Sequence, residues 1–309
     1  MIFNKNNNGS EELRALTGNY YLNNEFALIK TDIDLATEDL IKIIGQPVLD
    51  KVQKAYDEST ADLADLVERV QLPIALLATL KMSQKNDISH EDSGRKNKID
   101  SNSEKLPWEW QLKRDDEIHM DYYYRAVDRL ISYLDSKTYD EWKDSDYKKS
   151  LETLFIRNAE KFDQYFPIDR SGRLFVILCP FVREAQRLYI KPALGTDYAT
   201  LLAGKELTTA QKELLEYIYP PIPLLAMSLA IRRLPLSIIP AGVVRNYVSG
   251  SQTMNGSNPA SVSEVRALSS WLMDDALELV DLMKRQHNGT PVEFSMFPAN
   301  DENKKYMQI

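Results

Sequence analysis

The chain carries two copies of one sequence block, and this duplication limits what it can fold into more than any other feature. The block from Glu68 to Ala78 contains Pro73 followed by Ile-Ala-Leu-Leu-Ala, and the block from Glu216 to Ala226 contains Pro221 followed by Ile-Pro-Leu-Leu-Ala. The shared Glu, Pro, Ile, Leu, Leu and Ala recur 148 positions later. Two copies of a helical unit are more typical of a structural or binding protein than of a single-site enzyme.

The similarity extends well beyond this block, and the matched residues keep their order. The further pairs, at spacings from 148 to 153, are Phe26 with Phe175, Ile33 with Val182, Ala36 with Ala185, Ile41 with Ile190, Gly45 with Gly195, Ser89 with Ser237, Gly94 with Gly242, Met120-Asp121 with Met273-Asp274, and Val127-Asp128 with Val280-Asp281. This period is far longer than that of solenoid repeats. We therefore expect two domain-sized units, each burying its own core.

Composition bounds the class of protein. The 309 residues are 43% hydrophobic and 27% charged, which is typical of a globular chain. The formal net charge of −8 argues against a basic surface that wraps nucleic acid. The single cysteine, Cys179, cannot form an intramolecular disulfide, and its apolar neighbours favour a buried thiol over a nucleophile. The N-terminal residues lack the apolar core of a signal peptide, and we predict no membrane span.

Apolar spacing predicts helices in both halves. Asp32–Ile44 carries Ile33, Leu35, Ala36, Leu40, Ile43 and Ile44 at helical spacing, and Gly45 is expected to end this helix. The helix that contains Pro73 should be kinked there. Long helices are expected at 108–134 and 261–286, the second with a stripe of Val262, Val265, Leu268, Leu272, Leu279 and Met283.

A protrusion is expected between the kinked and long helices of each copy. In the first copy, residues 83–105 are polar and predict a long loop, whereas in the second, Leu236 to Val244 surrounds Pro-Ala-Gly242 and predicts a hairpin. The sequence after Gly289 predicts an extended tail with aromatic residues and no helical rhythm. An exposed apolar hairpin or terminal segment usually has a partner. The candidate partner-binding residues are Ile238, Ile239, Val243 and Val244 in the hairpin and Phe294, Met296 and Phe297 in the tail.

Catalytic and metal-binding patterns give no firm candidates. Asp115, Asp116, Glu117 and Asp121 resemble the aspartate-rich metal site of helical isoprenoid enzymes, but His119 stands where the third aspartate is needed, so a solvated helix face is the preferred interpretation. His90, His119 and His287 lack ligand spacing. The stretch from Gly195 to Lys205 is too long for a phosphate loop. We therefore predict no catalytic, metal or cofactor-binding residues.

Aromatic clusters at Trp108-Glu-Trp110 and Tyr122-Tyr-Tyr124 have few interleaved basic residues. This arrangement favours packing or a subunit interface over stacking on nucleic-acid bases.

The order of these elements resembles the head–tail connector (adaptor) proteins of tailed bacteriophages, and the whole chain resembles a protein family from phages and prophages of Bacteroidetes. The residues that carry the resemblance are Ala36 to Gly45, Pro73-Ile-Ala-Leu-Leu77, Ser89 to Gly94, Leu154-Phe-Ile-Arg-Asn158, Phe162 to Ile168, and Phe175. The resemblance implies a helical bundle that assembles into a ring under the portal and inserts a C-terminal segment into it. Typical connectors have one unit, whereas this chain has two, and its first copy lacks an obvious portal-docking tail.

We therefore expect a mainly α fold made of two tandem connector-like antiparallel helical bundles, each with a protruding loop or β-hairpin. The expected parts are a first repeat at 1–137, a linker helix at 138–150, a second repeat at 151–288 and an extended C-terminal tail at 289–309.

The resemblance implies a virion protein of the phage neck, assembled in the bacterial cytoplasm and not an enzyme. It would form a ring of about twelve copies by closed heterologous contacts. Its partners would be the portal protein and neighbouring neck and tail proteins, with DNA passing through the lumen without sequence-specific binding and no membrane contact. The alternatives are a cytoplasmic helical scaffold or regulatory binding protein, and a helical enzyme that uses the Asp115–Asp121 face.

Overall fold

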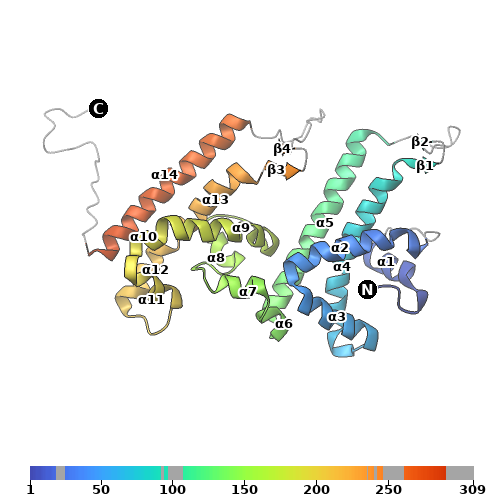
Figure 1. Cartoon of the computed structure of the whole chain (residues 1–309), viewed down its shortest axis with the longest axis horizontal. Helices are drawn as coiled ribbons and strands as arrows, with labels where there is room; N and C mark the ends of the chain where they lie inside the picture. The colour runs from blue at the N-terminus through green and yellow to red at the C-terminus, as the bar shows by residue number, and fades with distance from the viewer. Residues whose placement is uncertain are drawn as a thin grey trace.

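The computed structural model describes residues 1–18, 25–91, 94–96, 107–234, 236–239, 242–245 and 261–289, and in the strands it describes the backbone alone. The fold is mainly helical, as the sequence predicted. Figure 1 shows the two halves side by side, with the long helices α5 and α14 rising on the same side.

The first half is built around the helix α4, which packs against both α2 and α5. Its elements in chain order are η1 (Lys5–Asn7), α1 (Gly9–Thr17), α2 (Phe26–Ile44), α3 (Gln46–Glu58), η2 (Ala61–Leu63), α4 (Ala64–Asn86), β1 (Ser89–Glu91), β2 (Gly94–Lys96) and α5 (Glu109–Ser136).

The second half repeats this order with more interruptions. Two short helices, α6 (Asp140–Lys143) and α7 (Asp146–Leu151), lead into it. Its elements are α8 (Ala159–Asp163), α9 (Gly172–Ala185), the π-helical turn η3 (Gln186–Ile190), α10 (Lys191–Leu194), η4 (Gly195–Asp197), α11 (Tyr198–Ala203), α12 (Thr209–Ile218), α13 (Pro221–Arg233), β3 (Leu236–Ile239), β4 (Gly242–Arg245) and α14 (Val262–His287).

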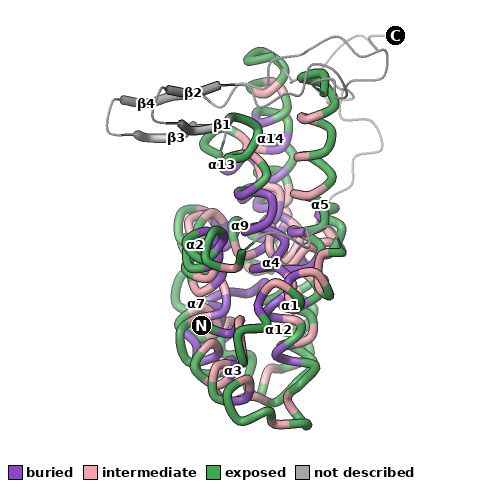
Figure 2. The backbone as a smooth tube through the Cα atoms, turned by 90° about the vertical axis from the view of Figure 1, so that its right-hand side faces the viewer, coloured by how far each residue is buried: buried purple, intermediate pink, exposed green. Residues whose placement is uncertain are grey.

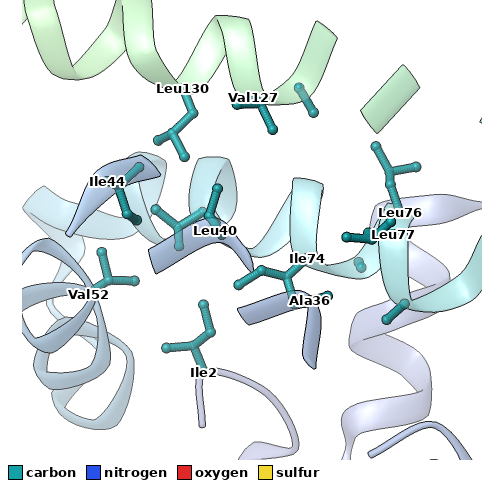
Figure 3. Close-up of a cluster of buried hydrophobic side chains, with 14 of the residues drawn as sticks. Ile2, Ala36, Leu40, Ile44, Val52, Ile74, Leu76, Leu77, Val127 and Leu130 are labelled. Atoms are coloured by element: carbon teal, nitrogen blue, oxygen red, sulfur yellow. The ribbon is translucent and has the colours of Figure 1, made fainter. Parts of the chain in front are cut away.

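Each half buries its own hydrophobic cluster. The first cluster runs from Ile2 to Trp142 and the second from Leu151 to Met283. In the first cluster, side chains from the N-terminal segment and from α2, α3, α4 and α5 converge, and ten of them are labelled in Figure 3. Burying one such aliphatic side chain contributes about 1.5–3 kcal/mol. Two separate clusters are the physical counterpart of the duplicated sequence.

The glycines that end the repeated helix behave alike in both halves. Gly45 follows α2 and Gly195 follows α10, and both have a positive φ, at 83° and 53°. A residue with a side chain is strained in this region, which accounts for glycine at both positions.

A π-helical turn explains why the spacing between the repeats changes from 149 to 150. A π-helical turn holds one residue more than an α-helical turn, and η3 lies in the second half where α2 is regular in the first. The sequence paired Ile190 with Ile41. When the alignment allows for the extra residue of the π-helical turn, Ile190 matches Leu40 instead. Both of these residues are fully buried.

The two copies of the repeated proline differ in their effect. The helix α4 continues through Pro73, whereas in the second half α12 ends at Ile218 and α13 begins at Pro221. The second copy adds Pro220 and Pro223, and each proline removes a backbone donor. The single helix of the first half is therefore two helices in the second.

Several local predictions were wrong. Leu35, expected in the buried stripe of α2, is 55% exposed, whereas Asp32 is buried. In α14 the buried face is Ser269, Leu272, Ala276, Val280 and Met283, because residues 262–268 extend beyond the core and leave Val262 and Leu268 exposed.

The segments predicted as a loop and as a linker helix also differ from expectation. The helix α4 continues to Asn86, and strands β1 and β2 pair where a loop from residue 83 was predicted. The predicted single linker helix is split into α6 and α7, because Ser145 caps α7 by accepting the backbone N–H of Lys148. Trp142 in α6 is buried in the first core.

One helical stretch, Thr209–Arg233, is long and apolar enough to cross a membrane by length and composition. It spans α12 and α13, and 56% of its most apolar window is buried in the protein. Its apolar side chains belong to the second core, as in the central helix of many globular folds.

Candidate interaction surface

The two long helices project beyond the hydrophobic cores at the same end of the molecule. The first buried residue of α5 is Tyr123, and the first of α14 is Ser269. Figure 2 shows the exposed upper turns of both helices above the mass of buried backbone. Residues 109–122 of α5 and 262–268 of α14 therefore contribute no buried residue to the cores.

Large apolar side chains lie on these projecting helices. Three of the four tryptophans are exposed, with Trp108 at 71% and Trp271 at 66%, whereas only Trp142 is buried. The exposed large apolar residues of the two helices are Trp108, Trp110, Ile118, Tyr122, Val262, Leu268, Trp271 and Leu277. Tryptophan and tyrosine dominate the energetics of protein interfaces, so this distribution indicates a binding surface.

Ile118 and Trp271 are equivalent positions in the two repeats, 153 residues apart, and both are exposed. The larger side chain at the second position makes the two long helices chemically different at equivalent points. The sequence had favoured internal packing or an interface for the aromatic cluster at Trp108, and the exposure of this residue agrees with the interface alternative.

The hairpins lie at this same end, as Figure 1 shows. Strands β1 and β2 pair antiparallel, as do β3 and β4. In the second hairpin Ile238 lies opposite Val243, and Ile239 lies opposite Gly242. Val244 is paired with Ser237. The backbone register therefore pairs two of the four predicted hairpin residues, Ile238 and Val243, whereas Ile239 and Val244 lie at the alternate positions.

The other predicted site residues, Phe294, Met296 and Phe297, lie outside the described residues. Their role stays a prediction from sequence.

The helices below the projecting end of the second half are joined by a reciprocal serine contact. Ser228 Oγ donates to the Ser269 carbonyl oxygen at 2.8 Å, and Ser269 Oγ donates to the Ser228 carbonyl oxygen at 2.9 Å. Both serines are buried. Small side chains let α13 and α14 approach closely while all four polar groups remain satisfied. In the first half, Leu80 and Asp116 stand at these positions.

An ion pair joins equivalent helices in each half. The acidic residue of the pair in the second half lies one helical turn further along its helix than the acidic residue in the first half. Lys85 at the end of α4 binds Asp32 of α2 at 2.5 Å, and Arg233 at the end of α13 binds Glu184 of α9 at 2.5 Å. Lys85 and Arg233 are equivalent, but Glu184 matches Leu35 and not Asp32. The Arg233 guanidinium donates a hydrogen bond to Glu184 and holds the pKa of that carboxyl below its usual range. The repeat alignment alone would not have found this pair, because its acidic partners do not align.

Two open hollows flank the helices. One, of about 370 Å³, lies beside the serine contact and is lined by Ser228, Arg232, Arg266, Ser269, Ser270, Met273 and Asp274. The other, of about 490 Å³, lies where the halves meet and is lined by Arg69, Asp128, Arg129, Ser132, Tyr133, Asp169 and Arg170. Both mix basic, acidic and neutral groups, so neither selects one ligand charge.

The acidic face of α5 forms local pairs. Asp116 accepts a hydrogen bond from Gln84 Nε2 at 3.0 Å, and Asp121 pairs with Arg125 at 2.8 Å. His119 lies 3.4 Å from Asp115. Among the described residues, no group of three His, Cys, Asp or Glu side chains is arranged to hold a metal ion.

The remaining polar candidates from the sequence lie apart. His287 Nε2 lies 2.9 Å from Asp197 Oδ2, and the side chain of His90 lies outside the described part. Cys179 is buried in the second core, and this burial raises the pKa of its thiol to about 12. A protonated buried thiol is a structural residue.

These features define a duplicated helical protein with exposed apolar side chains on its two long helices. The chain belongs to a protein family of unknown function (DUF6712), whose model matches residues 37–152 and again residues 182–306. The two matches indicate a duplication, as the repeated blocks do. Neither the curated proteins nor the solved structures gave a match.

The residues that the family model matches can be compared with the predicted division of the chain into two repeats, a linker and a tail. The first match begins within α2 and ends just after α7, so it includes the segment predicted as a linker. The second match begins within α9 and extends to residue 306, so it includes most of the predicted tail. The α6–α7 segment and residues 289–306 therefore occupy equivalent places in the two units.

Proposed function

We propose that the chain is a subunit of the head–tail connector ring of a tailed phage, docking beneath the portal protein. The observation that carries the proposal is the exposure of Trp108 at the projecting end of α5 and of Trp271 on α14, in the turn that follows its projecting end. A side chain of this size contributes strongly to binding when it is desolvated by a partner. The resemblance in element order to connector proteins supports this choice of partner.

The duplication suits a protein that is bound between two different partner proteins. The two projecting ends share a framework but differ in their apolar residues, so they would meet different partners. In the ring of about twelve copies, neighbouring subunits would make heterologous contacts that close by rotation. A net charge of −8 suits a lumen through which DNA passes without adhering.

Negative-stain microscopy and binding to the portal protein of the same phage genome test this proposal. We expect rings of the wild-type chain and a saturable complex with portal. Monodisperse monomers that do not bind portal would contradict the proposal and favour a cytoplasmic scaffold or regulatory protein.

Substitutions in the projecting ends sharpen the test. We expect Trp271→Ala and the double variant Trp108→Ala/Trp110→Ala to weaken portal binding at least about tenfold with an unchanged melting temperature, because these side chains contact little of their own core. Tyr217→Ala is the matched control, since Tyr217 is exposed on α12 and far from the projecting end in sequence. Equal binding by all three variants would exclude the projecting ends as the portal contact.

Deletion of residues 290–309 tests the tail separately. We expect unchanged helical content and melting temperature but loss of portal binding. A large fall in melting temperature would instead mean that these residues stabilise their own domain.

A further inference from the structure

Helices α2 and α9 are equivalent in the two repeats, but they carry opposite charges along one exposed strip. Asp34 and Glu38 of α2 form what we call the acidic strip. At the spacing of 149 residues, Arg183 of α9 and Arg187 of the π-helical turn stand at these positions, and we call them the basic strip. All four residues are exposed. The duplication has therefore kept the helix and reversed the sign of its outer charges.

Each strip places two like charges one helical turn apart. Like charges at this spacing destabilise a helix. Neither strip forms an ion pair within the part of the chain that the structure describes. Lys42, one turn beyond Glu38, is bound by Asp39 at 2.7 Å, so its charge is already compensated. A partner of opposite charge would stabilise each strip.

An exposed leucine lies next to each strip in the sequence. Leu35 follows Asp34 and is 55% exposed, and Leu188 follows Arg187 and is 52% exposed. Protein interfaces combine apolar side chains with arginine and a polar rim. Both strips therefore have the composition of an interface as well as its charge.

The net charge of the chain is divided unequally between its halves. Residues 1–150 hold 29 acidic and 21 basic residues and carry the whole net charge of −8, whereas residues 151–309 hold 17 of each. The first half of one chain therefore repels the first half of another, and a basic strip attracts it. The same net charge disfavours a polyanion such as DNA as the partner of the basic strip. Charge complementarity thus favours a second copy of this chain.

The two strips of one chain cannot satisfy each other. Figure 1 shows α2 and α9 in equivalent places in the two halves, running in the same direction. The inner side of α2 packs against α4, and the inner side of α9 packs against α13. Each strip therefore lies on the same outer side of its own repeat, where another molecule can reach it.

We propose that the acidic strip of one chain binds the basic strip of a second copy of this chain. In the proposed connector this is the contact between neighbouring subunits, so the inference rests on the proposed function. A guanidinium group donates two parallel hydrogen bonds to a carboxylate, which makes arginine the suitable cation for such a contact.

The test measures the oligomeric state of the full chain by analytical ultracentrifugation over a range of concentrations. We expect the wild type to form assemblies that weaken as the salt concentration rises from about 0.05 M to about 0.5 M, because salt screens exposed charges. We expect Asp34→Arg/Glu38→Arg and Arg183→Glu/Arg187→Glu each to weaken assembly at least about tenfold with an unchanged melting temperature. In each variant two strips of like charge would face each other.

A matched control separates the strip from net charge. Glu213→Arg/Glu216→Arg changes the net charge as much as Asp34→Arg/Glu38→Arg does, at exposed positions of α12. We expect it to assemble as the wild type does. Equal weakening by the control would mean that only the total charge matters, and this would overturn the proposal.

Mixing the two strip variants gives a sharper result. One variant has two basic strips and the other has two acidic strips, so an equimolar mixture should assemble although neither variant does alone. A chain that carries all four substitutions should also assemble by itself, since its two strips are exchanged and its net charge equals that of the wild type. Failure of both rescues would overturn the contact.

The remaining outcomes separate this inference from the connector proposal. Assemblies that persist in both strip variants overturn the contact but leave ring formation intact. Dimers that dissociate in both variants support the contact and contradict the ring, whereas larger assemblies that dissociate support both. A wild type that stays monomeric overturns the contact, and the portal-binding experiment then decides the connector proposal. Binding of a DNA duplex that only Arg183→Glu/Arg187→Glu abolishes would assign the basic strip to a polyanion and overturn the contact.

Discussion

Asp128, on α5 of the first repeat, caps the first turn of α9 in the second repeat by accepting the backbone N–H of Arg173 at 2.7 Å. The same carboxylate oxygen accepts the hydroxyl of Ser171, the N-cap residue of α9. Free N–H groups at a helix start need an acceptor, and a carboxylate is also favoured there by the helix dipole. A single side chain of the first repeat therefore holds the start of α9, whose buried residues belong to the second hydrophobic core.

Removing this cap should destabilise the junction of the repeats. We expect Asp128→Ala to lower the free energy of unfolding by about 1–2 kcal/mol, because the N–H of Arg173 loses its acceptor. Urea denaturation followed by circular dichroism measures the change. Asp275→Ala, an exposed aspartate of α14, should change the free energy by less than about 0.5 kcal/mol. Equal unfolding curves for wild type and Asp128→Ala would show that the cap does not stabilise the junction.

The serine contact between α13 and α14 predicts non-additive substitutions. Ser228→Ala and Ser269→Ala should each lower the free energy of unfolding by about 1 kcal/mol, because each removes one buried hydrogen bond. The double variant should cost less than the sum, since the two hydroxyls also lie 3.2 Å apart and each single substitution already removes that shared contact. A double-mutant cycle from urea denaturation checks this, with exposed Ser270→Ala as the control. Strictly additive costs would contradict a coupled pair.

The Arg233–Glu184 pair predicts a pH dependence. The hydrogen bond from Arg233 and its charge lower the pKa of Glu184, so the pair stabilises the fold above the unfolded value of about 4.3 and this contribution is lost as the pH falls through the lowered pKa. The contribution should be small because solvent screens the charges of both side chains.

Unfolding of wild type and Glu184→Gln between pH 7 and pH 3 measures this effect. The free-energy difference between the two proteins should shrink below about pH 4. Glu213→Gln, at an exposed position of α12, serves as the control. A difference that stays constant over this range would show that Glu184 gains nothing from Arg233 in its ionised form.

Burial of Cys179 predicts an unreactive thiol. Burial raises its pKa to about 12, so at pH 8 the native thiol should react with a disulfide reagent at least about 100-fold more slowly than the thiol of the urea-unfolded chain. A Ser270→Cys variant places a thiol on the exposed surface of α14 and should show one additional fast phase. Rapid labelling of the native wild-type chain would contradict the burial of Cys179.

The sequence predicted the elements whose residues repeat. The C-terminal end of α2, the approximate bounds of α5, the glycine after α2, and the burial of Ile33, Ala36 and Cys179 all follow from local spacing and chain neighbours. These features depend on which residues lie one helical turn apart, and that information is present in any window of the sequence.

Other features depend on where a helix ends relative to the core. Val262 and Leu268 continue the apolar stripe of α14, but they lie on the part that extends past the core, so they are exposed. Leu35 has helical spacing with its neighbours, yet none of the described elements covers it and it is exposed. The partners of Asp128 and Glu184 lie far away in the chain, and no local pattern selects them.

The sequence by itself determined that this protein is a duplicated helical chain, because hydrophobic periodicity and the repeated proline and glycine positions are local properties. Only the tertiary structure decided how the copies differ. It placed the π-helical turn in the second repeat, joined the repeats through Asp128 and left Asp281 exposed. The physical reason is that burial and hydrogen bonding are settled by which helices pack together, and equivalent residues in two copies meet different neighbours.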